Sequence, residues 1–457
     1  MRHLVQEARR QGLPLYLVGG AVRSRLLNPE ADIDNADLLI LGRAGDFAAA
    51  AAAALKRPAV RLNPQFDTVL IPDRSVEFEI SGPRGLLRTP PDQVSLPADP
   101  LERDLALRDF TVNALAQPLS PRRGALVDPT GGQADLEKRL LRTPLPAAIT
   151  LREDPLRILR AARLAAQWHF SLDRELLEAM HAERARVREC AAERRTAELL
   201  KILQTEKPSI GLKLLFITGV LEAAYPEIAA LSMAQDRKPR HKDVFEHTLK
   251  VVDTVAQAGA SLETRLAALL HDIGKPATRH FDPQAGWTFH GHEVLGERLV
   301  KRLGREWRLP AHTVEKTSRL VRLHMRPINL TDEEVTDSAV RRLRVQAGDD
   351  VDELLTLCRA DVTSSDPHKV RRYLKNFEKV VEHIRSVDEK DQLRAFQSPV
   401  RGETIMAETG LEPGPQVGRL KKMIEDAILD GAIPNEYEAA LEYLRKIKDS
   451  VLQDASS

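Results

Sequence analysis

The residues with the clearest chemical potential lie near the N-terminus, within residues 15–34. Gly19 and Gly20 end an apolar, strand-like run and precede a segment with helical spacing, where bare backbone and the first N–H groups of a helix suit a phosphate. Asp32 and Asp34 are two residues apart, so an extended backbone places both carboxylates on one side. Adjacent carboxylates repel unless a cation lies between them, and a hard cation such as Mg²⁺ fits. The stretch predicts a site for a metal-bound nucleoside triphosphate.

A second polar group follows in the segment LALRDFTVNALAQPL (105–119). Arg108 and Asp109 form an arginine–aspartate pair ahead of a helix, and Asn113 follows one helical turn later. A guanidinium can bind phosphate oxygens through two hydrogen bonds. We therefore expect Arg108 to contact the triphosphate, and Asp109 and Asn113 to fix the loop or the ribose.

A third group lies on the helix predicted from EDPLRILRAARLAAQWHF (153–170). Asp154, Arg157 and Arg160 are spaced at i, i+3 and i+6, roughly on one face. A guanidinium and a carboxylate together can bind a base that presents an amine beside a ring acceptor, as cytosine and adenine do. Uracil and guanine reverse this pattern, so one template can accept CTP and ATP and reject UTP and GTP. The alternative is an ordinary salt bridge on a helix.

The segments GGAVR (19–23), DID (32–34), RDFTVNA and EDPLRILR resemble motifs of the bacterial class II nucleotidyltransferases, the family of tRNA CCA-adding enzymes and poly(A) polymerases. This resemblance implies that Arg23 binds the triphosphate with the two glycines, that Asp32 and Asp34 are catalytic Mg²⁺ ligands, and that the helix selects the nucleotide. Ser24 and Asn28 depart from the family pattern, which often has aspartate and glycine there.

The resemblance also implies a third catalytic carboxylate on a later strand, about five residues before an arginine. Glu79 has this spacing to Arg84, and Glu77 on the same strand face remains the alternative. Two-metal phosphoryl transfer needs such bridging ligands.

A separate set of histidines and aspartates lies between residues 231 and 375 on helical segments. The spacing resembles the ligand set of HD phosphohydrolases, and the residues concerned are His247, His271, Asp272, His292, His324 and Asp361. Imidazoles with carboxylates suit a divalent transition metal, in one or two sites, that activates water against a phosphate ester. Lys275 is expected to hold the phosphate.

The composition of the chain restricts the kind of RNA-binding surface and the cellular location to be expected. The 457 residues carry a net charge of +1, so any RNA-binding surface must be local. Two cysteines indicate no disulfide framework and a cytoplasmic location. No membrane span or obligate protein partner is expected.

The elements that must position these groups indicate an α+β fold. A small head with a mixed β-sheet (1–145) is expected to precede a helical neck (146–230), an HD domain (231–375) and a helical tail (376–457). The strands within residues 58–72 and 75–82 are expected at a sheet edge.

The family resemblance implies a Mg²⁺-dependent, template-independent enzyme that adds CMP and AMP from CTP and ATP to the 3′ end of tRNA and releases pyrophosphate, with an HD phosphohydrolase activity beside it. The alternatives are a CC-only or A-only adding enzyme, a poly(A) polymerase, an HD phosphohydrolase with a vestigial polymerase head, and a non-catalytic RNA-binding relative.

Overall fold

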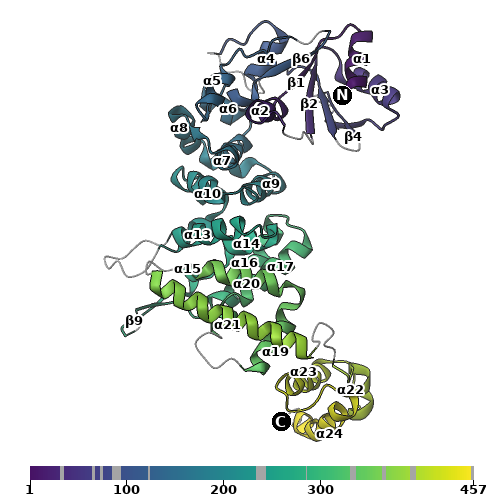
Figure 1. Cartoon of the computed structure of the whole chain (residues 1–457), viewed down its shortest axis with the longest axis vertical. Helices are drawn as coiled ribbons and strands as arrows, with labels where there is room; N and C mark the ends of the chain where they lie inside the picture. The colour runs from purple at the N-terminus through teal and green to yellow at the C-terminus, as the bar shows by residue number, and fades with distance from the viewer. Residues whose placement is uncertain are drawn as a thin grey trace. The chain divides into compact units, whose positions relative to one another are not determined.

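The computed structural model divides into two compact units, Met1–Ala230 and Leu231–Ser457 (Figure 1). The residues that it describes are 1–30, 35–63, 67–72, 76–84, 94–121, 124–232, 243–284, 286–329, 336–362, 367–391 and 398–453. The predicted domain boundaries stay predictions.

The first unit contains a six-stranded mixed sheet in the order β3-β4-β5-β2-β1-β6. Its strands are β1 (Leu15–Val18), β2 (Asn35–Ile40), β3 (Val60–Asn63), β4 (Thr68–Pro72), β5 (Glu77–Ser81) and β6 (Ala116–Ser120). β2 and β5 pair in parallel, and the other neighbours are antiparallel. The expectation that β5 lies at the sheet edge is wrong, because the crossover through α3, β3 and β4 returns the chain beside β2.

Along each central strand, successive side chains point to opposite faces of the sheet. β2 has the sequence NADLLI, and Leu38 and Ile40 are fully buried on the face opposite Asp37. α3 (Ala44–Leu55) is almost all alanine, the strongest helix former, and packs on β4 and on α1 (Arg2–Arg10). On the face that Asp37 shares, Val18 and Leu39 pack against Leu101 and Leu105 of α4 (Pro100–Ala106).

The rest of the first unit is helical. Its elements are α2 (Gly20–Leu27), the 3₁₀ helix Thr111–Asn113, α5 (Gly132–Glu137), α6 (Ala147–Glu153), α7 (Leu156–Trp168), α8 (Arg174–Ala182), the 3₁₀ helix Arg184–Glu189, α9 (Ala192–Leu203), α10 (Pro208–Ile217), α11 (Val220–Ala224), α12 (Pro226–Ala229) and the short parallel pair β7 (Leu140–Leu141) and β8 (Ser171–Leu172). α7 packs on α9 and α10 through a stripe that includes Ile158, Leu159 and Ala162. Glu153 ends α6 rather than beginning α7, because Asp154 is extended and joins the two helices.

The second unit is built from helices and one hairpin. Its elements are α13 (Val244–Gln257), α14 (Leu262–Leu270), α15 (Lys275–Thr278), β9 (His280–Asp282), β10 (Gly286–Thr288), α16 (His292–Glu306), α17 (Ala311–Leu323), α18 (Met325–Asn329), α19 (Asp337–Ala347), the 3₁₀ helix Gly348–Asp350, α20 (Val351–Asp361) and α21 (Pro367–Asp391). Asp243 and Ser261 cap α13 and α14 by accepting hydrogen bonds from backbone N–H groups. These two helices pack on each other and on α20, so their ends meet around one polar centre.

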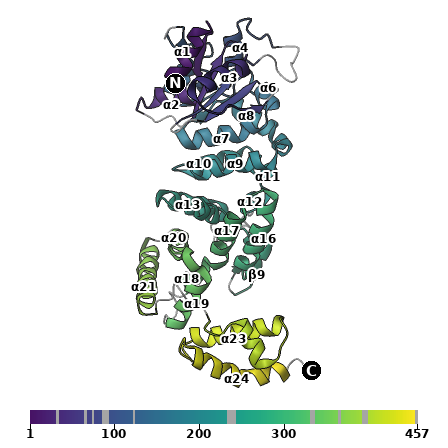
Figure 2. The same cartoon turned by 90° about the vertical axis from the view of Figure 1, so that its right-hand side faces the viewer.

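The C-terminal helices α22 (Gly402–Thr409), α23 (Pro415–Leu429) and α24 (Tyr437–Gln453) pack on one another around a core of their own, which includes Ile405, Leu420 and Leu444 (Figure 2). The expected α+β class, with a mixed sheet followed by helices, is confirmed. None of the described helices has the length and apolar character that crossing a bilayer requires.

Candidate active site and metal centre

A polar cavity of about 360 Å³ lies in the first unit, above the sheet. Its lining combines residues from the sheet, the loop before the first 3₁₀ helix, and α7, and consists of Gly19, Gly20, Asp37, Glu79, Ser81, Arg84, Arg108, Asp109, Asn113, Asp154, Arg157 and Arg160. Eight of the predicted nucleotide-binding residues are therefore brought together here. The remaining one, Arg23, is buried behind the cavity and binds Asn113.

Two carboxylates face the cavity from adjacent strands. Asp37 of β2 and Glu79 of β5 are direct partners in the parallel register, on strands that lie about 4.8 Å apart. Glu79 was predicted as a catalytic carboxylate, and its alternative Glu77 does not line the cavity. Asp37 was missed because it lies inside an apolar run that reads as buried strand. The strand period of two could have revealed it, because Leu38 and Ile40 point the other way.

The electrostatics of this pair favour a cation. Burial raises the pKa of Asp37, and burial and the nearby Asp37 raise the pKa of Glu79. Two neighbouring carboxylates repel each other when both are ionised, and a divalent ion that binds both removes this repulsion. The residues present therefore fit the metal that the predicted chemistry needs. The predicted Asp32 and Asp34 lie outside the described residues, and their roles stay predictions.

Gly19 makes the closest backbone approach to this pair. Its φ of +70° lies in the left-handed region, and a Cβ atom there would lie 2.7 Å from Asp37 Oδ2 and 3.2 Å from Arg108 Nη1. Only glycine leaves room for both side chains.

We expect the substitution Gly19→Ala to reduce nucleotide incorporation about a hundredfold, because it displaces Asp37 by a fraction of an ångström to an ångström. Gly12→Ala is the matched control: its φ is +67°, so the backbone strain is similar, but nothing lies within 4 Å of the added Cβ. Incorporation kinetics and melting temperatures of both variants separate the two effects. Equal losses of activity in both variants would contradict a specific role of Gly19.

Buried aspartates hold the arginines of the cavity. Asp104 accepts hydrogen bonds from Arg108 Nε at 3.0 Å and from the Arg84 backbone N–H at 3.1 Å. Asp104 was missed, although its i, i+4 spacing to Arg108, which follows the end of α4, was a signal. Burial lowers the pKa of Arg84 to about 10, so the side chain remains a cation at neutral pH. Two positive charges are thus fixed where an anionic ligand enters.

Asp109 links the loop to α7. Its carboxylate pairs with Arg160 Nη2 at 2.8 Å and accepts a hydrogen bond from Asn113 Nδ2 at 3.0 Å. Burial opposes ionisation, but Arg160 and Arg157 outweigh it and hold the pKa of Asp109 well below its usual range. Asn113 in turn accepts from Arg23. These contacts assign Asp109 a positioning role that agrees with the predicted fixing of the loop.

Asp154 and Arg157 lie at the start of α7. Asp154 Oδ1 accepts from the Leu156 N–H at 3.2 Å, and Asp154 Oδ2 pairs with Arg194 Nη2 of α9 at 3.2 Å. Arg157 donates to two backbone carbonyls, Leu107 O at 3.0 Å and Thr150 O at 3.2 Å. Both side chains line the cavity, which therefore presents a carboxylate and a guanidinium near the start of α7.

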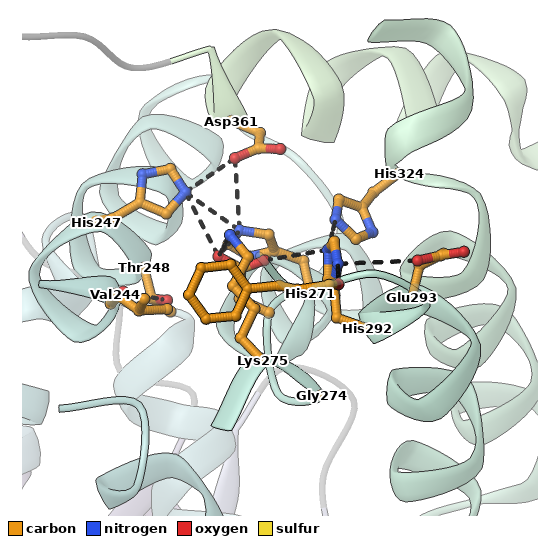
Figure 3. Close-up of polar contacts among 12 residues, drawn as sticks. Val244, His247, Thr248, His271, Gly274, Lys275, His292, Glu293, His324 and Asp361 are labelled. Atoms are coloured by element: carbon orange, nitrogen blue, oxygen red, sulfur yellow. Dashed lines mark hydrogen bonds and ion pairs between the residues drawn. The ribbon is translucent and has the colours of Figure 1, made fainter. Parts of the chain in front are cut away.

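In the second unit, the six predicted ligands converge from the ends of five helices (Figure 3). They are His247 of α13, His271 and Asp272 directly after α14, His292 at the start of α16, His324 directly after α17 and Asp361 at the end of α20. They form two groups, in each of which the ligand atoms lie within 4.8 Å of one another: the first is His247, His271 and Asp361, and the second is Asp272, His292 and His324. Two neighbouring metal sites are therefore geometrically available.

Backbone contacts fix the ring orientations at this centre. Nδ1 of His271, His292 and His324 lies 2.7–2.9 Å from a backbone carbonyl oxygen in each case. A carbonyl only accepts, so Nδ1 carries a proton in each ring, and whenever a ring is neutral its Nε2 keeps the lone pair. The Nε2 atoms of His292 and His324 face each other at 3.3 Å. Two lone pairs at this distance repel unless a cation lies between them, and the donor set therefore fits a metal.

Charge at the centre favours the same conclusion. Burial and the neighbouring His271 lower the pKa of His324 to about 4, so its ring is neutral, as a ligand must be. Burial disfavours the charged form of His271, but Asp272 and Asp361 outweigh this and raise its pKa to about 10. The carboxylates of Asp272 and Asp361 thus favour a positive charge around His271. Lys275 Nζ lies 2.7 Å from Asp272 Oδ2, and its side chain is partly exposed.

Models of three protein families match successive parts of the chain. They are the "Poly A polymerase head domain" over residues 15–142, the "Probable RNA and SrmB- binding site of polymerase A" over 169–231, and the "HD domain" over 244–366. Among solved structures, the Bacillus stearothermophilus CCA-adding enzyme in complex with CTP is similar in fold, with a TM-score of 0.65 and 22% identity over 99% of this chain and 97% of that one.

Curated relatives are similar over most of their length. The CC-adding tRNA nucleotidyltransferase of Thermus thermophilus is 35% identical over 93% of this chain and 92% of its own. The A-adding enzyme of Deinococcus radiodurans is 33% identical over 76% and 80%, and the multifunctional CCA protein of Neisseria meningitidis is 33% identical over 68% and 72%. The chain therefore belongs to the class II tRNA nucleotidyltransferase and poly(A) polymerase family, with an HD domain.

Proposed function

We propose that this tRNA nucleotidyltransferase adds both CMP and AMP to the 3′ end of tRNA, from CTP and ATP, with Mg²⁺ as the metal and pyrophosphate as the product. The observation that carries the proposal is the cavity, which is lined by the carboxylates Asp37 and Glu79 together with several arginines and with Asp154. Relatives of this chain include enzymes that add CC, A or the whole CCA end.

In this proposal each group of residues has one task. Gly19 and Gly20 admit the triphosphate close to the backbone, and Arg108 and Arg84 neutralise its oxygens. A Mg²⁺ ion, when bound, neutralises charge on the triphosphate and favours the ionised 3′-hydroxyl of the RNA. Asp37 and Glu79 hold it, with Asp32 and Asp34 as predicted further ligands. The hydroxyl oxygen attacks the α-phosphorus, and pyrophosphate leaves.

Base selection falls to Asp154 and Arg157. The guanidinium donates to the ring nitrogen and the carboxylate accepts from the exocyclic amine, an arrangement that cytosine and adenine satisfy and that uracil and guanine do not. Because the same two groups serve both bases, the cavity supports addition of both nucleotides.

Replacing Asp154 by alanine is expected to reduce the preference for CTP over UTP by at least about tenfold, because the acceptor for the amine is lost. The matched control is Asp173→Ala, since Asp173, like Asp154, accepts a hydrogen bond from the backbone N–H two residues later at the start of a helix, but does not line the cavity. Each variant's kcat/KM for the four nucleotides gives the preference. An unchanged preference in Asp154→Ala, or the same change in both variants, would refute the assignment.

An incorporation assay tests which nucleotides are added. Purified protein with Mg²⁺ receives tRNA that ends before CCA, after the first C, or after CC, and each nucleoside triphosphate separately. Ordered addition of C, C and A, followed by a stop, is the expected result.

A second candidate is a CC-adding enzyme, favoured by the similarity to the Thermus thermophilus relative over 93% of the chain. In that case the substrate ending in CC would remain unextended, whereas a long A tail would indicate a poly(A) polymerase.

We further propose that the second unit is a metal-dependent phosphohydrolase with a divalent transition metal at the His247–Asp361 centre. The paired Nε2 atoms and the two groups of three ligands support this proposal. When bound, the metal supplies a water of lowered pKa as nucleophile. Lys275 is placed to bind the phosphate beside it.

A further inference from the structure

The hairpin of β9 and β10 lies between two parts of the metal centre in the chain: Lys275 precedes it and His292 follows it. Its strands are antiparallel, and Phe281 is the register partner of Trp287. In Figure 1 the hairpin lies at the periphery of the second unit, away from the packed helices. It therefore adds nothing to their core.

The hairpin nevertheless carries a group of aromatic and basic side chains. Phe281 exposes 55% of its surface, and its ring meets that of Trp287 edge to face, with 5.1 Å between centroids. The Arg279 guanidinium lies 3.8 Å from the centroid of the Trp287 ring. Exposed rings beside a guanidinium plane are the surfaces on which proteins stack unpaired nucleobases.

The chain links the aromatic and basic side chains of the hairpin to the metal centre through Phe289. Phe289 O accepts a hydrogen bond from Nδ1 of the ligand His292 at 2.9 Å. Lys275 Nζ lies 5.7 Å from the Phe289 ring centroid and 2.7 Å from Asp272 Oδ2. Trp287 precedes Phe289 by two residues, about 7 Å along an extended chain. The rings are thus linked to the metal centre through Phe289, which follows Trp287 by two residues and lies beside Lys275.

We propose that the β9–β10 hairpin is a base-stacking platform that makes the second unit select ribonucleotides or single-stranded RNA ends over phosphate esters without a base. The inference rests on the proposed phosphohydrolase activity of this unit. In the reaction, the oxygen of water bonds to phosphorus, the bond from phosphorus to the ribose 3′ oxygen breaks, and that oxygen takes up a proton. Inorganic phosphate is released.

The test compares Phe281→Ala with the full-length wild type on adenosine 3′-monophosphate, on a short single-stranded RNA with a 3′-phosphate, and on glycerol phosphate. We expect KM for the two base-containing esters to rise about tenfold while kcat, the metal content and hydrolysis of glycerol phosphate stay unchanged. Phe281→Tyr should restore the wild-type KM. Tyr437→Ala is the control, since this aromatic residue is also exposed, at 49%, but lies in α24.

Fluorescence provides a second readout that does not depend on hydrolysis. In a Trp168→Phe, Trp307→Phe background, which leaves Trp287 as the single tryptophan, adenosine 3′-monophosphate should quench the emission, and Phe281→Ala should weaken this quenching. Unchanged quenching, or equal effects on all three esters, overturns the platform and leaves the phosphohydrolase in place. A protein that holds no metal and hydrolyses no ester, but shows the quenching, loses the phosphohydrolase proposal alone. If Phe281→Ala raises KM for the RNA but not for adenosine 3′-monophosphate, the hairpin is a platform for RNA ends.

Discussion

Replacing Asp37 by alanine should reduce nucleotide incorporation at least about a hundredfold, the loss typical of removing one group that balances charge in a transition state. Asp37 and Glu79 are register partners on parallel strands and face the same cavity, so removal of either breaks the pair. The melting temperature should change little, because Asp37 is not part of the apolar core. Single-turnover incorporation of CMP into tRNA and thermal unfolding measure the two quantities.

The controls decide which aspartates form the centre. Asp46→Ala removes an exposed aspartate on α3 that forms an ion pair with the exposed Arg43, so it should leave incorporation unchanged. Asp32→Ala and Asp34→Ala are assayed in parallel, and the predicted ligand role requires that they also lose incorporation. Full activity in Asp37→Ala, together with loss in Asp32→Ala and Asp34→Ala, would show that Asp37 is not a metal ligand.

The second large effect is expected at the centre in the second unit. The purified protein should contain a divalent transition metal, and either His271→Ala or His324→Ala should remove about half of it, because these histidines belong to different groups of three ligands. Hydrolysis of bis(p-nitrophenyl) phosphate should fall at least about a hundredfold in both variants. Incorporation by the first unit should remain, since the cavity and this centre lie in separate compact units.

Elemental analysis and hydrolysis rates after treatment with a chelator complete this test. His312→Ala is the matched control, because His312 also belongs to α17 but its side chain is 77% exposed at the other end of the helix. If both ligand variants keep the metal content and hydrolysis of the wild type, the centre is not where the metal binds. Loss of all metal in each single variant would instead indicate one site that needs both groups.

The ligands of the second unit could be predicted because each lies at or near the end of a helix with a strong apolar period. His271 and His324 follow buried stretches of α14 and α17, and the HD doublet is recognisable by itself. Similarly, Asp154 and Arg157 were identifiable from helical spacing beside a proline. In both cases the chemistry depends on local geometry, which residue types and spacing determine.

Asp37 illustrates what the sequence does not determine. Its role follows from parallel pairing with β5, and this pairing depends on the crossover through α3, β3 and β4. Strand register over such a distance is decided by packing of whole faces, not by neighbouring residues. Asp104 was missed for a related reason: ion pairs at i, i+4 spacing are common, and only the burial of both side chains distinguishes this one. The tautomers of the histidines likewise depend on carbonyls that no pattern of residue types specifies.

The anchors of the two side chains proposed to select the base, Arg157 and Asp154, differ in how they respond to evolutionary change. Arg157 is fixed by the carbonyl oxygens of Leu107 and Thr150, groups that every amino acid possesses, so substitutions at those positions leave the anchors in place. Asp154 Oδ1 likewise has a backbone anchor, the Leu156 N–H, but Oδ2 is held by the side chain of Arg194, which a single codon change can remove. Drift in nucleotide preference within such enzymes should therefore enter through the position of Arg194 rather than through the neighbours of Arg157. We therefore expect the position of the Arg157 guanidinium to be preserved among such enzymes and the position of the Asp154 carboxylate to vary.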